Sequence, residues 1–434
     1  MKKTVFALLV VLALVAVACG GGGNTAQQQA PAASQGGASN AAAPTGAAQA
    51  GGGAAKATGQ LQLMGWSSSD AENTRLQDLV KNYNGKYPNA QASLNLVPEY
   101  DTKLQTALAG GTPPDAFYVD SLKLPDLVKA GALAPGTGKV QDQEDFYPFA
   151  TQAFTYNGTY YCPAKDFSTL ALIVNTDMLN AAGVKPPTNW DELRAAAQKL
   201  TDPSKKQYGL VIPNDLARFA AFVYQAGGQI MSDDRTQSKF NSPEVKQAWD
   251  YYVGLYKDGY ARMPSEVDAG WPGEAFGKGN AAMVVEGNWI APFLKDKFPN
   301  IKWQAVELPA GPKGKATLAF TVCYAVPAKA KSADASWQLV NYLTGKEGMK
   351  AWTDLGLAMP TRKSLSADWQ AKFPDYKAFA AGADYARPWQ FVTGFSDATD
   401  TINNDLKAAF QGQMTTDQAL KEADQVINQI AKNK

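Results

Sequence analysis

The apolar and polar residues between positions 61 and 120 follow two periods, which predict strands that alternate with helices. Ser69 and Glu72 form the two ends of a capping box that opens the first helix, and residues 100–109 predict the second. Three short runs have the character of strands, at residues 61–66, 94–96 and 116–119. This order predicts a parallel α/β sheet, whose ligands bind at the carboxyl ends of the strands.

The α/β pattern continues through the second half of the chain. A helix is predicted after Ser242, which is followed by a proline, and Trp249 lies on the apolar stripe of this helix, as expected of a core residue. The region from residue 333 onward is mostly helical and is expected to cover one lobe. Further strands are predicted at residues 170–175, 208–212, 281–285 and 321–326.

Residues 1–19 have the pattern of a secretion signal. Two lysines precede an unbroken apolar run from residue 5 to residue 17, and Cys19 follows small residues at the expected cleavage point. The pattern resembles the bacterial lipobox, although Ala16 stands where that motif usually carries leucine. We predict export, cleavage and acylation of Cys19, and plain signal cleavage is the alternative.

Residues 20–59 consist almost only of Gly, Ala, Gln, Ser, Asn, Thr and Pro, with Lys56 as the one charge. This composition cannot bury enough apolar surface to offset the chain entropy, so it predicts a flexible tether. The remaining stretch of about 375 residues is longer than one hydrophobic core usually serves, which predicts two lobes.

The composition excludes several classes of function. The 41 Lys and Arg residues balance 40 Asp and Glu residues, so no basic field would attract nucleic acid. The chain has no histidine, which excludes Ser-His triads and His-based zinc sites, and no cofactor or metal is expected. Besides Cys19, the chain contains only Cys162 and Cys323, which can form a disulfide in an oxidising compartment.

A series of short motifs along the body resembles the family 1 extracellular solute-binding proteins, which serve sugar importers of the ATP-binding-cassette (ABC) type and include maltose- and trehalose-binding proteins. The motifs lie, in the order of the family, at residues 65–69, 103–115, 163–169, 281–283, 287–289, 324–327, 359–362 and 386–388. Each motif is weak alone, whereas their number, order and spacing make chance similarity improbable.

The resemblance implies a two-lobed, periplasmic-binding-protein-like α/β fold with a hinge and a ligand cleft between the lobes, and it implies no catalysis. The lobes would close on the ligand by a hinge motion, in the manner of a Venus flytrap. On this pattern the N-terminal lobe comprises residues 60–164 and 324–364, and the C-terminal lobe comprises residues 165–323 and 365–434.

A sugar presents apolar C–H faces and a ring of hydroxyl groups, so its site needs aromatic platforms and polar partners. Trp289 follows Gly287 and Asn288 directly after a predicted strand, and the resemblance implies a stacking tryptophan at this motif. The alternative is an indole wedged under the next helix. Trp271 and Trp389 are further candidates for an aromatic platform.

Candidate polar groups lie at the ends of the first strands. Asp120 ends an apolar strand and precedes Ser121, so its carboxylate is placed to accept two hydroxyl hydrogen bonds, and the resemblance often implies an acid there. Asp70 and Glu72 open the first helix, where a favourable interaction with the helix dipole is the competing interpretation. Ser68 lies in the turn before them.

Further candidates lie where the segments are expected to cross between the lobes. Asp166 and Phe167 occupy the first crossing and are predicted to line the cleft. Arg387 precedes Pro388, which favours an extended backbone, and its planar fork suits paired sugar oxygens. A surface salt bridge is the competing interpretation for Arg387.

The resemblance places Cys162 and Cys323 in the two segments expected to cross side by side, at positions where many relatives have glycine. We therefore hypothesise a disulfide at the hinge, which would stiffen the hinge or limit its opening. Two free thiols buried as small apolar groups are the alternative.

The expected function is reversible capture of a di- or oligosaccharide, which favours the closed state by touching both lobes, and its delivery to the permease of an ABC importer. Two alternatives stay open: a binding protein for a non-sugar solute, such as a polyol or glycerol phosphate, and a carbohydrate-active hydrolase that uses paired carboxylates. The expected partners are the sugar, the permease and the membrane, reached through a lipid on Cys19. We expect a monomeric, membrane-anchored lipoprotein in the periplasm or on the outer face of the cell membrane.

Overall fold

The computed structural model describes residues 58–67 and 69–432. The predicted signal with Cys19, residues 20–57 of the predicted tether, and Ser68 lie outside the described residues. In the part that is described, no helix combines the length and the apolar character needed to cross a bilayer.

The first part of the chain forms a parallel α/β arrangement, as predicted. β1 (Gly59–Trp66) pairs in parallel with β2 (Ala90–Val97) and with β3 (Ala116–Asp120). The connecting helices are α1 (Asp70–Lys86) and α2 (Tyr100–Ala109). Because parallel strands end at the same edge of a sheet, β1 and β3 present their last residues side by side.

The ends of two helices confirm the predicted start signals. Ser69 accepts a hydrogen bond from the backbone N–H of Glu72, and the Glu72 side chain accepts one from the backbone N–H of Ser69, which completes the capping box of α1. Ser242 caps α8 (Pro243–Lys257) in the same way by accepting from the N–H of Val245. Local sequence therefore determines where these helices begin.

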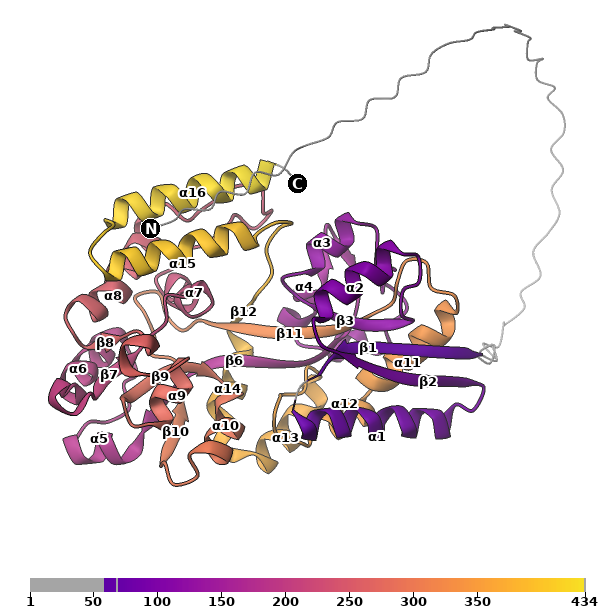
Figure 1. Cartoon of the computed structure of the whole chain (residues 1–434), viewed down its shortest axis with the longest axis horizontal. Helices are drawn as coiled ribbons and strands as arrows, with labels where there is room; N and C mark the ends of the chain where they lie inside the picture. The colour runs from indigo at the N-terminus through magenta and orange to yellow at the C-terminus, as the bar shows by residue number, and fades with distance from the viewer. Residues whose placement is uncertain (1–57, 68, 433–434) are drawn as a thin grey trace, which may run out of the picture. The chain divides into compact units, whose positions relative to one another are not determined.

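Two long strands extend the sheet beyond β3. β11 (Thr317–Ala325) lies antiparallel between β3 and β6 (Ala164–Asn175), and Figure 1 shows β6 and β11 running side by side. The strands predicted at residues 170–175 and 321–326 correspond to parts of these longer strands. The short β12 (Ala386–Pro388), which the sequence pattern did not predict, pairs in parallel with the beginning of β11.

The main path of the sheet has the strand order β2-β1-β3-β11-β6-β9-β7-β8, so three further strands lie beyond β6. β9 (Ala281–Gly287) is antiparallel to β6 and parallel to β7 (Tyr208–Val211), which pairs with β8 (Ala261–Arg262). β10 (Trp303–Val306) pairs with the far end of β6. A separate hairpin consists of β4 (Thr155–Tyr156) and β5 (Thr159–Tyr160).

Helices pack around these strands, and α15 and α16 lie side by side (Figure 1). The other helices are α3 (Leu124–Lys129), α4 (Pro148–Ala153), α5 (Thr176–Ala182), α6 (Trp190–Leu200), α7 (Leu216–Gln225), α9 (Pro272–Gly277), α10 (Ile290–Lys297), α11 (Ala333–Thr344), α12 (Lys346–Thr353), α13 (Ser366–Lys372), α14 (Lys377–Ala381), α15 (Ser396–Phe410) and α16 (Thr416–Lys432).

Buried apolar residues form two clusters. One includes Phe117 of β3 and Tyr324 of β11, whereas the other includes Phe219 of α7, Trp249 of α8 and Ile402 of α15. Trp249 is fully buried with its ring edge-on to Phe219 at 5.3 Å between centroids, which confirms its predicted core position. β6 and β11 contribute residues to both clusters, so these strands join the two cores.

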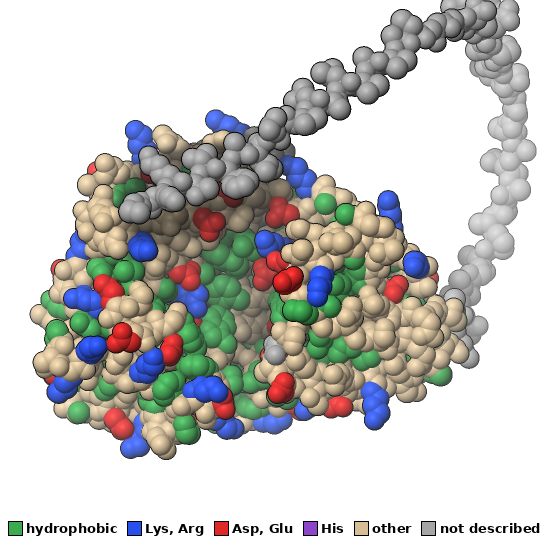
Figure 2. All heavy atoms as spheres, viewed as in Figure 1, with side chains coloured by type: hydrophobic (Ala, Val, Ile, Leu, Met, Phe, Trp, Pro, Cys, Tyr) green, Lys and Arg blue, Asp and Glu red, His purple; other side chains and the backbone are tan. Residues whose placement is uncertain are grey.

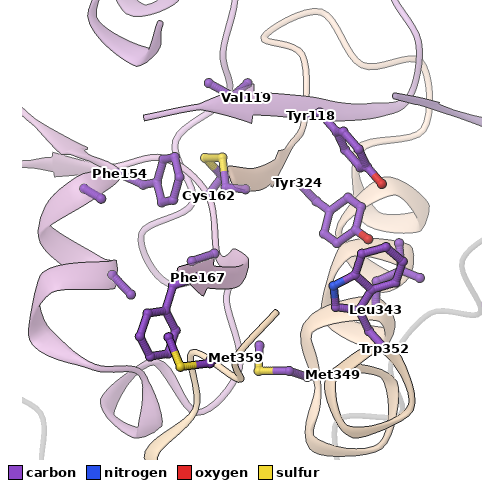
Figure 3. Packing of buried hydrophobic residues seen from close by; sticks show 14 of the residues in the cluster. Tyr118, Val119, Phe154, Cys162, Phe167, Tyr324, Leu343, Met349, Trp352 and Met359 are labelled. Carbon is purple, nitrogen blue, oxygen red and sulfur yellow. A yellow bond between two sulfur atoms is a disulfide. The ribbon is translucent and has the colours of Figure 1, made fainter. Parts of the chain in front are cut away.

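A disulfide joins Cys162 and Cys323, whose Cα atoms are 5.7 Å apart. Cys323 lies on β11 opposite Val119 of β3 and Ala164 of β6, and both half-cystines are fully buried. Figure 3 shows the bond inside the apolar cluster, near Val119 and Phe154. The disulfide therefore ties the segment that leads into β6 to β11, at one end of the crossing pair.

Loss of this disulfide should lower the free energy of unfolding by about 2–5 kcal/mol, because it closes a long loop in the unfolded chain. The two cysteines are 161 residues apart. Urea unfolding with and without reductant measures the effect, and the Cys162→Ala/Cys323→Ala variant, which reductant should not alter, is the control. Equal urea midpoints for the oxidised protein and for protein shown by thiol counting to be reduced would contradict the prediction.

Candidate functional site

An aromatic group lies at the carboxyl ends of β1 and β3. The ring of Trp66, the last residue of β1, is edge-on to Tyr100 and Tyr118, with centroids 5.4 Å and 4.8 Å apart. The hydroxyl of Tyr100 donates to the backbone oxygen of Tyr118 at 2.6 Å, which fixes the trio. Trp66 and Tyr100 line a cavity of about 530 Å³ together with Asp120 and Lys123.

Asp120 brings a carboxylate to this cavity. Its Oδ1 accepts a hydrogen bond of 2.8 Å from the backbone N–H of Leu122. Burial raises the pKa of Asp120 to about 6, although the Leu122 N–H and the nearby Lys123 act in the opposite direction. The group is thus ionised at neutral pH, is half-buried, and keeps lone pairs for a ligand.

The register of the sheet places more side chains on the same face as Asp120. Val322 of β11 lies opposite Asp120 on one side and opposite Asp166 of β6 on the other. Phe320 lies two positions before Val322 on β11, opposite Ser168, and therefore points to the same face. Figure 2 shows a hollow near the centre of the molecule, with apolar side chains along it.

Trp289 continues this surface from Phe320. The two rings meet edge-on at 5.7 Å between centroids, and Phe320 also lies 6.0 Å from the ring of Trp389. The indole Nε1 donates to Oε2 of Glu286 at 2.8 Å, and the guanidinium of Arg218 lies 5.6 Å from the indole centroid. Trp289 is half-buried, so one part of the indole stays accessible while the other is held.

A buried ion pair holds the indole in place. Arg218 of α7 donates to Glu286 at 2.8 Å and to Asp215 at 2.9 Å, and the Glu286 side chain is fully buried. Burial raises the pKa of Glu286, while Arg218 and the indole N–H of Trp289 act in the opposite direction. Oε1 of Glu286 and Nε of Arg218 have no hydrogen-bond partner within the described structure, so this network has unused donor and acceptor capacity near Trp289.

Gly287 and Asn288, predicted as ligand-binding residues, are fully buried and instead position Trp289. A Cβ atom at Gly287 would lie 2.1 Å from the Trp289 ring, so only glycine lets the indole fold back at this point. The amide of Asn288 donates to the backbone oxygen of Leu357 at 2.7 Å. Because Gly287 is buried, it cannot contact a ligand directly, which corrects its prediction as a ligand-binding residue.

Ser121 is also placed differently from the prediction, since it is fully buried and its hydroxyl donates to the backbone oxygen of Trp389 at 2.7 Å. The hydrogen bond joins the end of β3 to the residue after β12. Ser121 therefore holds Trp389 rather than a ligand. Trp389 is itself only 8% exposed, so it offers little surface for contact with a ligand.

The structure buries Asp166 and Phe167, which were predicted to line the cleft. Asp166 forms an ion pair with Lys165 and accepts a 2.7 Å hydrogen bond from the indole N–H of Trp352. Phe167 packs edge-on against Phe149 at 4.9 Å and is 2% exposed. The prediction is wrong for Phe167, because its side chain points from β6 into the core (Figure 3), and it is weakened for Asp166, whose carboxylate is already paired.

The remaining predicted residues have other positions or contacts in the structure. Asp70 and Glu72 stand in the first turn of α1, where Glu72 serves the capping box. Trp271 packs edge-on against Phe293 at 4.7 Å. Arg387 lies on β12 and lines a different cavity from the one that Trp66 and Asp120 line, so its role in sugar binding stays a prediction.

Five residues of this surface were not predicted: Trp66, Tyr100, Arg218, Glu286 and Phe320. A signal existed for Glu286, because a carboxylate in an otherwise apolar strand directly before Trp289 needs a buried partner. Trp66 carried a similar signal as the last residue of a strand at the ligand-binding edge. Within the described part of the chain, no group of three acidic or cysteine side chains is arranged to hold a metal ion.

The sequence is similar to a known family of proteins over most of its length. Residues 78–381 match the bacterial extracellular solute-binding proteins, which is most of the described chain. The chain belongs to this family. Its members are binding proteins that act outside the cytoplasm, so the surface around Trp289 and Asp120 is the candidate site of a solute-binding protein.

Several relatives extend over nearly the whole of this solute-binding protein. The arabinooligosaccharide-binding protein of Bacillus subtilis is 25% identical over 84% of this chain and 92% of its own. An ABC substrate-binding protein of Listeria monocytogenes, solved in complex with cycloalternan, is 26% identical with a TM-score of 0.75 and covers 85% of this chain and 98% of its own. The cyclic α-maltosyl-1,6-maltose-binding protein of Arthrobacter globiformis, at 22% identity, shares the fold with a TM-score of 0.79 over 87% of this chain and 100% of its own. These similarities show the two-lobed binding-protein fold.

Removal of the buried carboxylate beneath Trp289 should be costly. Glu286→Ala leaves the guanidinium of Arg218 partly buried without its main counterion and should lower the free energy of unfolding by about 3–5 kcal/mol. Glu274→Ala is the matched control, since it removes a partly exposed ion pair with Lys278 and one hydrogen bond from the Gly270 N–H, and it should cost much less than Glu286→Ala. Urea unfolding measures both, and equal small losses would contradict the role given to Glu286.

Proposed function

We propose that this extracellular solute-binding protein captures a di- or oligosaccharide on the surface formed by Trp66, Asp120, Phe320 and Trp289, and delivers it to the permease of an ABC importer. The observation that carries the proposal is the half-exposed indole of Trp289, held by hydrogen bonds and ring contacts. Such an indole offers a flat apolar face to the C–H groups of a sugar ring. Because it is already ordered, little entropy is lost when the sugar binds.

Asp120 supplies the polar part of the proposed site. An ionised, half-buried carboxylate accepts strong hydrogen bonds from the hydroxyl groups that surround the sugar ring. Trp66 and Tyr100 border the same cavity and offer aromatic surface for a further ring. Because Trp66 ends β1 and Trp289 follows β9, the two indoles offer separate platforms, which suit a ligand with two or more rings.

The proposal includes closure of two lobes around the ligand. The N-terminal lobe would comprise residues 60–164 and 324–364, and the C-terminal lobe residues 165–323 and 365–434, with β6 and β11 at the crossing. A sugar that contacts Asp120 in one lobe and Trp289 in the other would favour the closed state, because it gains contacts only there. The disulfide between Cys162 and Cys323 would then limit how the crossing strands move.

The relatives support a sugar ligand over the alternatives. One relative is named as an arabinooligosaccharide-binding protein, and another was solved in complex with cycloalternan. A binding role without catalysis agrees with the family and with the state of Asp166, whose carboxylate pairs with Lys165 and Trp352 rather than facing a second acid. We also propose a monomer anchored through a lipid on Cys19, with the tether predicted at residues 20–59. Mass spectrometry of membrane-extracted protein tests for the acyl chain.

Calorimetric titration with maltotriose, arabinotriose and their monosaccharides tests the proposed site. Trp289→Ala removes the aromatic platform and should weaken the binding of the preferred trisaccharide about tenfold or more, since stacking contacts contribute on the order of 1.5 kcal/mol. Trp289→Phe, which keeps a ring, is the matched control and should lose less. If no sugar binds the wild type while a polyol or glycerol phosphate does, the sugar proposal falls and the family assignment stands.

The affinity for the sugar should fall as the pH drops through about 6, the pKa to which burial raises Asp120. At pH 5 only about one-tenth of this group would remain ionised, so affinity should be about tenfold lower than at pH 8. The Asp120→Asn variant, which cannot ionise, should bind weakly with an affinity that changes little over this range. A wild-type affinity that is constant from pH 8 to pH 5 would show that the carboxylate does not accept from the sugar.

A further inference from the structure

Arg387, which the sequence analysis assigned to the sugar site, lines a separate cavity of about 830 Å³. The lining also includes Tyr224 of α7, Arg235 of the loop after α7, and Lys313 of the segment before β11. We call this cavity the Arg235–Arg387 groove. Its volume lies in the range of small-molecule sites, about 300–1,000 Å³.

The groove carries positive charge that the protein does not neutralise. Among the described residues, neither Arg235 nor Arg387 forms an ion pair or a hydrogen bond through its side chain. The nearby Glu307 is engaged, since it accepts from Lys315 at 2.9 Å and from the hydroxyl of Tyr385 at 2.6 Å. Two guanidinium groups are therefore available to an anion from outside.

Arg235 has lost water without gaining a counterion. It is half-buried, and burial lowers its pKa, while the hydroxyl groups of Tyr156 and Tyr224 act in the opposite direction. Its backbone is held in the left-handed region at φ 56° by a hydrogen bond of 2.8 Å from its N–H to the oxygen of Ser232. Keeping a non-glycine residue in this conformation costs free energy, so the turn that carries the Arg235 side chain is held in one backbone conformation.

The lining also includes a buried acceptor without a donor. Gln390 is 4% exposed, and its amide nitrogen donates to the backbone oxygens of Ala153 and Thr155 at 2.8 Å and 3.2 Å. These two bonds fix which way the amide points, and its Oε1 has no partner within the described structure. A buried acceptor of this kind needs a donor, which a ligand hydroxyl supplies.

Two carboxylates also line the groove, and their positions limit what it can hold. Asp233 and Asp384 are exposed, and Asp233 already accepts from the amide of Gln229 at 3.1 Å. Arg387 is exposed as well, and exposed charges of either sign are screened by water and salt, whereas the half-buried Arg235 is screened much less. The deeper part of the groove therefore favours an anion.

We propose that the Arg235–Arg387 groove is a second binding site, distinct from the proposed sugar site, for a small organic anion that also carries hydroxyl groups. Its carboxylate or phosphate accepts from the two guanidinium groups, which match the geometry of such oxygens in pairs. A hydroxyl group of the same molecule donates to Oε1 of Gln390. Trp66, Asp120 and Trp289 take no part, so both ligands can bind at once.

Calorimetric titration of the purified full chain with glucose 6-phosphate and glucuronate tests the proposal. Saturable binding of at least one probe is expected, and the probe that binds shows whether phosphate or carboxylate is preferred. The Arg235→Gln/Arg387→Gln variant should bind that probe about tenfold more weakly or worse, because two charge-assisted contacts are lost. The Arg194→Gln/Lys278→Gln variant removes the same charge elsewhere and should stay within about twofold.

Four outcomes would overturn the proposal. One is the absence of saturable binding of either probe to the wild type. Another is an equal loss in the two double variants, which would mean non-specific attraction. A third is loss of binding in Trp289→Ala with retention in Arg235→Gln/Arg387→Gln, which would place the anion in the sugar site. The last is binding of inorganic phosphate or of neutral glucose as tight as that of the probes. Equal binding of phosphate would rule out the hydroxyl contact with Gln390, and equal binding of glucose would rule out recognition of the negative charge.

Discussion

The antiparallel pairing of β6 with β11 is the interaction on which the rest of the structure depends. These two strands contribute to both apolar cores, and their register determines which side chains share a face. On its other edge β11 pairs with β3, which puts Val322 opposite Asp120, so Asp120 and Phe320 share the face that β6 and β11 continue. The disulfide of Cys323 with Cys162 secures this pairing at one end, so the geometry of the proposed site and the stability of the fold have the same origin.

The two halves of the proposed site show how a protein prepares a polar ligand site before the ligand arrives. Burying Glu286 costs free energy, which the ion pair with Arg218 offsets, and the result is an indole with one orientation. Asp120 is held in a different way, by one backbone N–H and by partial loss of water, so that its remaining lone pairs are left for hydroxyl groups. Order on the aromatic side and desolvation on the acidic side both reduce the cost of binding a flexible, hydrated sugar. The Arg235–Arg387 groove follows the same physical logic with the opposite charge.

Local signals in the sequence predicted the elements well where local physics decides them. The caps at Ser69 and Ser242 and the short strands around Leu63 and Phe117 required only spacing and side-chain type. β12 was missed because three residues that end in proline carry no strand pattern, and its pairing with β11 is a tertiary contact. β6 is longer than predicted because Lys165 and Asp166 interrupt the apolar run and are compensated by Trp352, which is far away in the sequence. Trp289 could be found from its position after a strand, but Arg218 could not, since only the fold brings α7 to β9.

The most direct test of the central claim is a crystal structure of the protein with its preferred oligosaccharide bound. The account predicts one sugar ring stacked on the accessible face of Trp289 and a hydroxyl group of another ring within hydrogen-bond distance of the Asp120 carboxylate. It also predicts that the Glu286–Arg218 pair is unchanged beneath the indole. An oligosaccharide bound away from both Trp289 and Asp120, or bound to Trp289 with Asp120 still facing solvent, would contradict the claim that the register of β3, β11 and β6 builds one continuous site.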